Sequence, residues 1–225
     1  MCLLMYKKKE FDISKKYSEH LYTGMMGVMM RYCHRSLENF SNNKKSYNQI
    51  LEIGAGIEPH DKYIKHPYKE YHILETSDFA LDELSLNKKY ILHKYDGENI
   101  PFDDESFDRI IISHSLEHIE KPEEFMIKIM KILRKDGVFS ISLPTDPGLL
   151  WRSARFINGF FKAKKTYNIS RLEYNYINAT EHINSVFNLR AIIKYKYKNN
   201  YEEYFYPTRI KSPDINLFYN VHIKK

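Results

Sequence analysis

The stretch that decides the fold is Ile50-Leu51-Glu52-Ile53-Gly54-Ala55-Gly56, in which an apolar run ends abruptly in a glycine turn. A short apolar run bounded by glycine is typical of a buried strand, and we expect this strand to span residues 47–53. Glycines at such a turn let the backbone bend sharply and approach a bound nucleoside at the carboxyl end of a parallel sheet. The stretch therefore predicts an α/β fold that binds a nucleoside.

After this strand, strand-like and helix-like segments alternate along the chain. The expected strands are residues 71–74, 90–95, 107–113 and 138–143, and the expected helices are residues 79–86 and a segment that begins at Pro122. We expect the second helix to close with Arg134-Lys135-Asp136-Gly137, because cations and glycine are common at helix carboxyl ends. Such alternation predicts a parallel sheet with helices on both faces.

The two ends of the chain lie outside this alternating pattern. Residues 11–41 carry apolar side chains at helical spacing, and we expect residues 1–46 to form an N-terminal helical cap. The main domain should then span residues 47–225. Within it, residues 146–180 are aromatic, basic and irregular, which indicates an insertion after the fifth strand. A helix at 186–195 and strands at 201–206 and 217–223 are expected to follow.

Composition narrows the class of protein. A chain of 225 residues suits one α/β domain with a modest appended element, and a hydrophobic content of 43% argues against disorder. The net charge is +6, but basic and acidic residues are interleaved, so charge alone does not indicate nucleic-acid binding. No apolar run approaches the ~20 residues needed to cross a bilayer. We expect a soluble, cytoplasmic protein without membrane insertion, and the oligomeric state stays open.

The residues after the glycine turn distinguish between possible cofactors. A dinucleotide site has a third glycine three residues on, where a helix amino terminus receives the pyrophosphate. This chain has Pro59 at that position, and Glu58 places a carboxylate where the pyrophosphate would lie. S-adenosylmethionine has no phosphate and tolerates an acid there. The turn therefore favours S-adenosylmethionine over a dinucleotide.

Carboxylates also follow the next two strands. Glu75 ends the second strand, about twenty residues beyond the turn, where an acid can accept hydrogen bonds from both ribose hydroxyls. The third strand ends in Asp96-Gly97-Glu98, which offers a carboxylate beside the adenine. Three such features in register at strand ends reinforce the prediction of an S-adenosylmethionine site.

From Gln49 to Pro144 the sequence resembles the class I S-adenosylmethionine-dependent methyltransferases, specifically the small-molecule group with the ubiquinone- and menaquinone-type enzymes. The resemblance rests on the segment from Asp96 to Asp108 and on Ser113-His114-Ser115-Leu116-Glu117-His118. One departure is Asp136-Gly137, where the family usually has two glycines. The resemblance implies a Rossmann-like fold with a mostly parallel seven-stranded sheet, an antiparallel C-terminal strand, N-terminal helices and the insertion.

The resemblance also implies roles for particular residues, and S-adenosylmethionine as the cofactor. The cofactor-binding residues that it implies are Glu52, Gly54, Ala55 and Gly56 at the methionine end, Glu75 and Thr76 at the ribose, Asp96, Gly97 and Glu98 at the adenine, and Ser113 and His114 at the methyl-transfer site.

The segment from Pro144 to Arg152, with Glu181-His182-Ile183-Asn184, more loosely resembles methyltransferases of surface-polysaccharide biosynthesis. This resemblance implies a sugar hydroxyl as acceptor. Such a hydroxyl has a high pKa and needs a general base, for which His182 and His114 are our catalytic candidates, with Glu181 and Asp146 as alternatives. Arg152 and Arg155 could contact a phosphate or carboxylate of a nucleotide-linked or acidic sugar, or could simply form a solvated basic face.

Three alternatives remain open beside this interpretation. Methylation of another small metabolite or of RNA is possible, although enzymes that methylate base nitrogens typically carry Asn or Asp, two prolines and an aromatic residue where this chain has Ser113-His114-Ser115-Leu116. This argues against methylation of base nitrogens but leaves other RNA reactions open, and we expect a small-molecule acceptor in preference to a nucleic acid. A binding protein without catalysis would also keep the fold, but the intact glycines and strand-end acids argue against it.

The segment from His114 to His118 also spells H-x-x-E-H, an order found in one class of zinc peptidases. A zinc site of that kind needs both histidines on one helix face and a third ligand. Because this segment straddles a strand end and a turn, we expect no metal site and a structural or capping role for His118.

Overall fold

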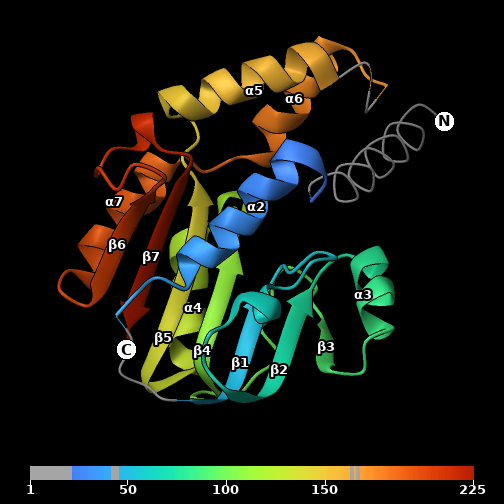
Figure 1. The fold of residues 1–225 in the computed structure, drawn as a ribbon. Helices are drawn as coiled ribbons and strands as arrows, with labels where there is room; N and C mark the ends of the chain where they lie inside the picture. The colour runs from blue at the N-terminus through green and yellow to red at the C-terminus, as the bar shows by residue number, and fades with distance from the viewer. Residues whose placement is uncertain (1–21, 42–45, 163–164, 166–167) are drawn as a thin grey trace.

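The computed structural model describes residues 22–41, 46–162, 165 and 168–225, and they form a seven-stranded sheet with helices around it (Figure 1). The strand order is β3-β2-β1-β4-β5-β7-β6. The strands are β1 (Tyr47–Ile53), β2 (Tyr68–Glu75), β3 (Tyr90–Lys94), β4 (Phe107–Ser113), β5 (Leu133–Pro144), β6 (Tyr201–Tyr206) and β7 (Phe218–Lys224). β7 runs antiparallel to β5 and β6, whereas the pairs among β1 to β5 are parallel. The predicted Rossmann-like sheet with one antiparallel C-terminal strand is confirmed.

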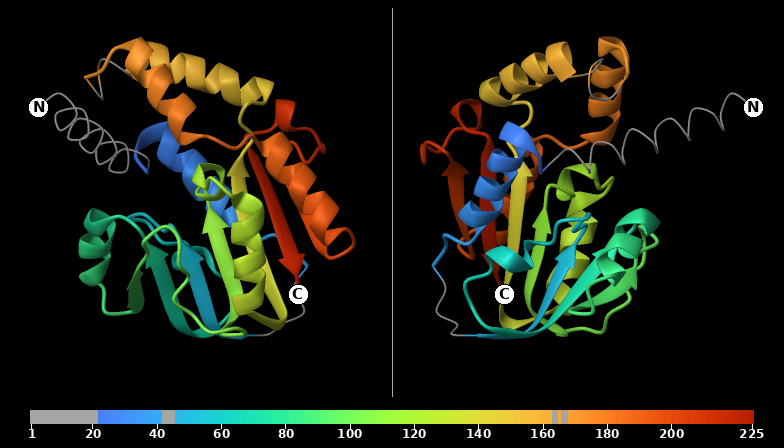
Figure 2. Two further views of the ribbon diagram at one scale, coloured as in Figure 1. Left: turned by 180° about the vertical axis from the view of Figure 1, so that it is seen from behind. Right: turned by 45° about the vertical axis from the view of Figure 1, so that its right-hand side comes forward.

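Helices cover both faces of this sheet (Figure 2). They are α2 (Gly24–Leu37), α3 (Asp78–Ser85), α4 (Pro122–Ile132), α5 (Leu149–Lys162), α6 (Arg171–Glu181) and α7 (Val186–Tyr197), with short 3-10 helices η1 (His60–Tyr63), η2 (Leu116–His118) and η3 (Pro213–Ile215). On one face α2 lies across the strands, and on the other α4 and α7 lie side by side. The expected pattern of a doubly covered sheet is thus observed.

The isoleucines of β4 show how the sequence fits two cores. Ile110 and Ile112 pack in the cluster that contains Phe125 of α4 and Leu189 of α7, whereas Ile111 packs with Leu37 of α2. Successive side chains of a strand point to opposite faces, so a strand that is covered on both faces must be apolar at consecutive positions. This explains why the apolar run of β4 has no polar alternation.

The junction of α4 and β5 differs from the sequence prediction. The expected helix extended to Gly137, but α4 ends at Ile132 and Leu133 already pairs with Phe107 of β4. The backbone of Leu133 is extended, and Asp136 adopts a left-handed φ of 60°. The pairing of Leu133 with β4 therefore ends α4 earlier than the cations and the glycine of residues 134–137 predict.

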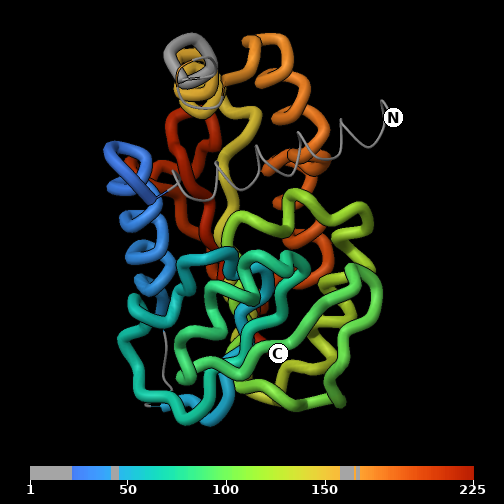
Figure 3. The backbone as a smooth tube through the Cα atoms, turned by 90° about the vertical axis from the view of Figure 1, so that its right-hand side faces the viewer, coloured from blue at the N-terminus to red at the C-terminus, as the bar shows by residue number. Residues whose placement is uncertain are grey.

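Residues 146–180 are also more regular than expected. The segment predicted as irregular contains α5 and nearly all of α6, which contact each other beyond the carboxyl end of β5 (Figure 1 and Figure 3). The sequence did contain a signal for α6, because Ser170 and Glu173 form a capping box at its amino end. No described side chain of α6 is buried, so the helix lies on the surface of the molecule.

The expected N-terminal cap is described only in part. Residues 1–21 lie outside the described residues, and the part that is described contains α2, which contacts β5 and β7. Within the described chain, no helix is long and apolar enough to cross a membrane. The division at residue 46 and the role of residues 146–180 stay predictions.

Candidate functional site

The glycine turn lies at the carboxyl end of β1. Gly54 and Gly56 adopt left-handed φ values of 68° and 57°. The Gly54 amide donates to the carbonyl of Leu74 at 2.9 Å, and the Ser115 hydroxyl donates to the carbonyl of Gly54 at 3.2 Å. A Cβ atom on Gly54 would lie 2.5 Å from Ser115 Oγ. The turn therefore needs glycine at position 54 for both its conformation and its close approach to Ser115.

The carboxylate of Glu75 connects this turn to the end of β2. Its Oε2 atom accepts a hydrogen bond from the Gly56 amide at 2.9 Å, and its Oε1 atom accepts from the amides of Thr76 at 2.7 Å and Ser77 at 3.0 Å. The Glu75 side chain is buried, and Thr76 is exposed. These contacts hold the acid at the sheet edge where the ribose prediction requires it.

The carboxylate of Asp96 organises the turn after β3. It accepts hydrogen bonds from the amides of Glu98 at 2.8 Å and Asn99 at 2.7 Å, and from the Asn99 side chain at 2.9 Å. The bonds from Asn99 and Glu98 lower the pKa of Asp96 to about 2. Gly97 adopts a φ of 91° within this turn. Asp96 is therefore an ionised, fixed acceptor at the mouth of the site.

These three turns surround one cavity of about 980 Å³. That volume is at the upper end of the range for small-molecule sites, about 300–1,000 Å³. The predicted cofactor residues that line it are Gly54, Gly56, Glu75, Thr76, Asp96, Gly97 and Glu98. Its walls also contain residues that were not predicted to bind the cofactor, among them Ile57, Phe79, Asn99, Ser115, His118 and Lys128. The structure thus brings most of the predicted nucleoside site together.

Glu52 and Ala55 are not among the residues that line the cavity. The Glu52 carboxylate accepts hydrogen bonds from the His60 amide at 2.9 Å and the Tyr71 hydroxyl at 2.7 Å, beneath η1. Burial raises the pKa of Glu52 to about 7. Ala55 packs against the core on the α2 side of the sheet. Both residues therefore support the turn in this structure.

Ser113 and His114 lie at the end of β4, and neither is among the residues that line the cavity as the described chain forms it. The Ser113 hydroxyl is buried and has no hydrogen-bond partner among the described residues. His114 has a left-handed φ of 53°, and its Nε2 atom lies 3.2 Å from Cys33 Sγ on α2. Burial, together with the charges of His182 and His118, lowers the pKa of His114 to about 3. His114 is therefore a neutral imidazole near the site.

His182 follows α6, where its ring contacts the buried carboxylate of Asp146. The Nδ1 atom donates to Asp146 Oδ2 at 2.9 Å, because a carboxylate can only accept. Arg155 of α5 forms an ion pair with the same oxygen. Burial alone would raise the pKa of Asp146, but the His182 hydrogen bond and the Arg155 charge hold it below its usual value.

The two arginines of α5 therefore differ. Arg155 is partly buried in the ion pair with Asp146, whereas Arg152 is exposed and its guanidinium has no ion-pair partner among the described residues. The structure does not join them into one anion-binding pair. Arg152 is the one whose charge is available to a ligand.

A second grouping was not expected from the sequence. Glu117 and His118 of η2 lie beside His182, and one ligand atom from each is within 4.8 Å of the others. His118 also lines the cavity, and its ring meets the ring of His182 edge-on at 5.0 Å between centroids. Residues 118 and 182 are distant in sequence and no local pattern connects them, so the sequence does not predict this grouping.

Comparisons with known proteins agree with this geometry. Residues 51–141 match the model of the methyltransferase domain family. A curated candidate methyltransferase of Rickettsia prowazekii is 35% identical over 97 residues, which is 42% of this chain and 42% of that protein. The chain therefore matches less than half the length of this relative.

Solved structures share the fold over nearly the whole chain. The plantazolicin methyltransferase BpumL, in complex with S-adenosylhomocysteine and a monoazolic desmethylPZN analogue, is 16% identical with a TM-score of 0.62, and the alignment covers 99% of each chain. A candidate S-adenosylmethionine-dependent methyltransferase of Methanococcus maripaludis is 18% identical with a TM-score of 0.60, covering 96% of this chain and 93% of that one. At such identities the likeness shows the fold.

The domain match and the fold agree with each other. Residues 51–141 match the methyltransferase domain family, and the fold is the one seen in solved S-adenosylmethionine-dependent methyltransferases, a class whose cofactor is S-adenosylmethionine. The matched residues 51–141 contain the carboxyl end of β1, all of β2, β3 and β4, and most of β5, together with Gly54, Glu75 and Asp96.

Proposed function

We propose that this protein transfers a methyl group from S-adenosylmethionine to a hydroxyl of a small molecule, and that the acceptor is a sugar or a related surface-polysaccharide precursor. The observation that carries the proposal is the single cavity lined by Gly54, Glu75 and Asp96, at the carboxyl ends of three adjacent strands. Ligands of open α/β sheets bind at this edge. The methionine end would lie at the glycine turn, the ribose at Glu75 and the adenine at Asp96.

The reaction is an in-line displacement at the methyl carbon. The bond from sulfur to the methyl group breaks as the bond from the acceptor oxygen forms, S-adenosylhomocysteine leaves, and the hydroxyl proton passes to a base or to water. Since the sulfonium already activates the carbon, the protein mainly aligns the reactants, which can contribute about 7–11 kcal/mol. The chain needs a rigid cofactor cradle and an acceptor site that faces it.

His182 is the catalytic residue that we propose on the acceptor side. Asp146 holds its Nδ1 atom, which leaves Nε2 available for the acceptor. The neighbouring His118 is in the cavity wall, so His182 contacts a residue that lines the proposed cofactor site. His114 is the second catalytic candidate, and its low pKa means that it would act as a neutral group that contacts the acceptor.

The proposed acceptor site lies between this cavity and residues 146–180. Arg152 is exposed on α5, above the strand ends, and would meet a phosphate or carboxylate of a nucleotide-linked or acidic sugar. Trp151 of the same helix is partly buried against Cys33 and Phe218 and would supply part of an apolar wall. This division assigns the cofactor to β1–β3 and acceptor selection to the insertion.

Calorimetric titration with S-adenosylmethionine tests the cofactor assignment. The Glu75→Gln variant keeps the shape of the side chain but removes the charge that would bind the ribose, and we expect binding to weaken by about 1.5–3 kcal/mol. Glu70→Gln is the matched control, because Glu70 is an exposed acid on the same strand outside the cavity lining. Equal affinity in a folded Glu75→Gln variant would reject the ribose assignment.

A separate screen of nucleotide-linked sugars as methyl acceptors would identify the acceptor.

A further inference from the structure

We infer that Glu117, His118 and His182 form a binding site for one divalent transition-metal ion at the edge of the cofactor cavity. The ligand atoms of these three residues lie within 4.8 Å of one another. Two imidazoles and one carboxylate are a ligand set that binds zinc and neighbouring transition metals and leaves coordination positions open. Magnesium and calcium prefer oxygen ligands alone and would be disfavoured here.

The contacts of the two histidines support the assignment independently of their proximity. The Nδ1 atom of His118 donates to the carbonyl of Glu181 at 2.7 Å, and the Nδ1 atom of His182 donates to the Asp146 carboxylate at 2.9 Å. Histidines that bind metals usually donate their other ring nitrogen to a carbonyl or carboxylate, which fixes the tautomer and the ring orientation. Both rings are therefore fixed with a lone pair on Nε2.

The carboxylate of Glu117 provides a further observation. Its side chain is buried, and its Oε2 atom has no hydrogen-bond partner among the described residues. Its Oε1 atom lies 3.8 Å from His118 Nε2 and 3.9 Å from His114 Nδ1, beyond hydrogen-bond range. A buried carboxylate oxygen without a hydrogen-bond partner is costly. A cation between these atoms would satisfy it.

The observed separations describe an open site. Metal–ligand distances of ~2.1 Å place tetrahedral ligand atoms about 3.4 Å apart, so the three side chains would have to close on the ion by up to about 1 Å. Small shifts of the two rings that keep their Nδ1 hydrogen bonds would achieve this, because neither His118 nor His182 is fully buried. His114 Nδ1 lies close enough to Glu117 to join as a further ligand.

The position of the site gives it a use in the proposed reaction. It lies between His118, which lines the cofactor cavity, and Asp146, which pairs with Arg155 of the insertion. An ion held there would take the Nε2 lone pair of His182 in place of the acceptor, and would instead bind an acceptor oxygen at an open coordination position and orient it toward the cavity. This use rests on the proposed function, whereas the metal site itself does not. With an ion bound, Asp146 would be a positioning residue, because it holds the ring of His182. This proposal differs from the expectation, drawn from the sequence, that the chain has no metal site.

Titration of the untagged, chelator-treated protein with Zn²⁺, and separately with Mn²⁺, tests the site by calorimetry and by metal content after dialysis. We expect one Zn²⁺ per chain from this site, and an affinity at least about 100-fold weaker in Glu117→Gln and in His182→Asn. Asp146→Asn should weaken binding about 10–100-fold by releasing the second ring nitrogen. The control is His93→Asn, which disrupts a pair of histidines on β2 and β3, with His93 Nε2 3.0 Å from His72 Nδ1.

Each outcome bears on the metal site alone. If Zn²⁺ binding is the same in His182→Asn as in the unaltered protein, or is lost in His93→Asn instead, the assignment is wrong. Because Glu117 is buried, circular dichroism must show that each variant keeps the native fold. If Glu117→Gln does not fold, the test rests on His182→Asn, because His182 is partly exposed and its replacement disturbs the fold less. Metal binding without turnover of any acceptor would leave the site standing and count only against the proposed reaction.

Discussion

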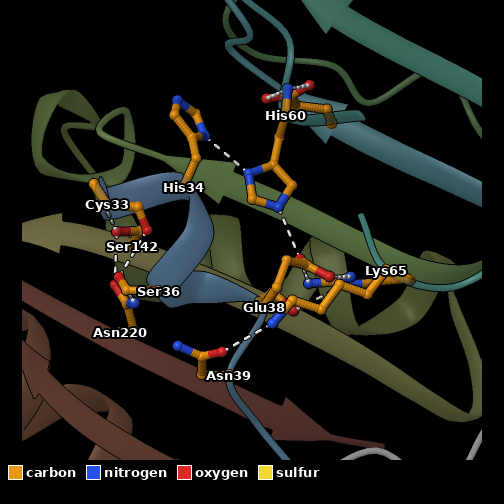
Figure 4. A network of polar contacts seen from close by, with 12 residues as sticks. Cys33, His34, Ser36, Glu38, Asn39, His60, Lys65, Ser142 and Asn220 are labelled. Atoms are coloured by element: carbon orange, nitrogen blue, oxygen red, sulfur yellow. Dashed lines mark hydrogen bonds and ion pairs between the residues drawn. The ribbon is translucent and has the colours of Figure 1, made fainter. Parts of the chain in front are cut away.

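The carboxylate of Glu38 forms two hydrogen bonds with the guanidinium of Arg109, at 3.1 Å and 2.6 Å, and neither side chain is exposed to solvent. His60 lies on the other side of the acid, with its Nε2 atom 2.8 Å from Glu38 Oε1, and its Nδ1 atom is 2.8 Å from His34 of α2 (Figure 4). This network joins α2 to β4 and to the loop after β1. It therefore attaches the described part of the N-terminal segment to the face of the sheet.

Replacement of Glu38 by glutamine should destabilise the fold strongly. The variant leaves the Arg109 cation buried without its counter-ion, and losing one partner of a buried pair costs about 3–5 kcal/mol. Urea unfolding followed by circular dichroism measures this. The control is Glu58→Gln, whose partner Lys62 is exposed, and a surface pair contributes about 0–1 kcal/mol. Similar losses in both variants would contradict the structural role of Glu38.

The same pair makes stability depend on pH. Burial raises the pKa of Glu38, but the charge of Arg109 and the hydrogen bonds from His60 and Arg109 outweigh it and hold the pKa well below 4.5. As the pH falls, the unfolded chain takes up this proton first, so the stabilisation is complete above pH 4.5 and is lost below it. Between pH 5.5 and 3.5 the free energy of unfolding should fall more steeply in the unaltered protein than in Glu38→Gln. Parallel slopes would show that other groups dominate.

The buried imidazole of His114 predicts a second pH window. Burial lowers its folded-state pKa from 6.5 to about 3, so the unfolded chain binds this proton at a higher pH than the folded chain. Its contribution to stability is therefore present above pH 6.5 and is lost progressively as the pH falls toward 3. His114→Gln should flatten the fall in unfolding free energy between pH 6.5 and 5. An unchanged slope would mean that the pKa of His114 is the same in the folded and the unfolded chain.

The sequence predicts the strands and the cofactor turns well for a physical reason. β1 and β4 begin and end where predicted, because each is an apolar run with a clear boundary. Gly54, Glu75 and Asp96 converge because the carboxyl ends of adjacent parallel strands share one edge of the sheet. Local sequence and topology are sufficient for both.

Contacts between distant segments could not be predicted in the same way. Glu52 has the right position for a cofactor ligand, yet its carboxylate bonds to His60 and Tyr71, and nothing near Glu52 in the sequence indicates this. The partners of Glu38 and His182 are likewise remote, since they depend on how α2 and the loop after α6 pack against the sheet. Side-chain partners of this kind follow from tertiary packing and not from a local pattern.

The two glycines of the cofactor turn should respond differently to alanine. Both require a left-handed residue, which costs an alanine roughly 1–2 kcal/mol. Only at Gly54 does the added Cβ clash, at 2.5 Å from Ser115 Oγ, whereas nothing lies within 4 Å at Gly56. Thermal unfolding should therefore show Gly54→Ala to be less stable than Gly56→Ala by at least ~1 kcal/mol. Adding Ser115→Ala should restore part of this difference, and equal stabilities would contradict the close approach.

The last prediction separates the two arginines of α5. Arg152→Ala removes an exposed cation without an ion-pair partner among the described residues, so it should raise the KM for an anionic acceptor and change S-adenosylmethionine affinity by less than about 0.5 kcal/mol. Arg155→Ala also removes the partner of Asp146, which positions His182, so it should lower kcat as well. Lys69→Ala removes an exposed cation in β2 and is the matched control for loss of charge.

Steady-state kinetics with cofactor titration of each variant measures both effects. Loss of cofactor binding with unchanged acceptor kinetics would place α5 in the cofactor pocket and reject the proposed division of the chain.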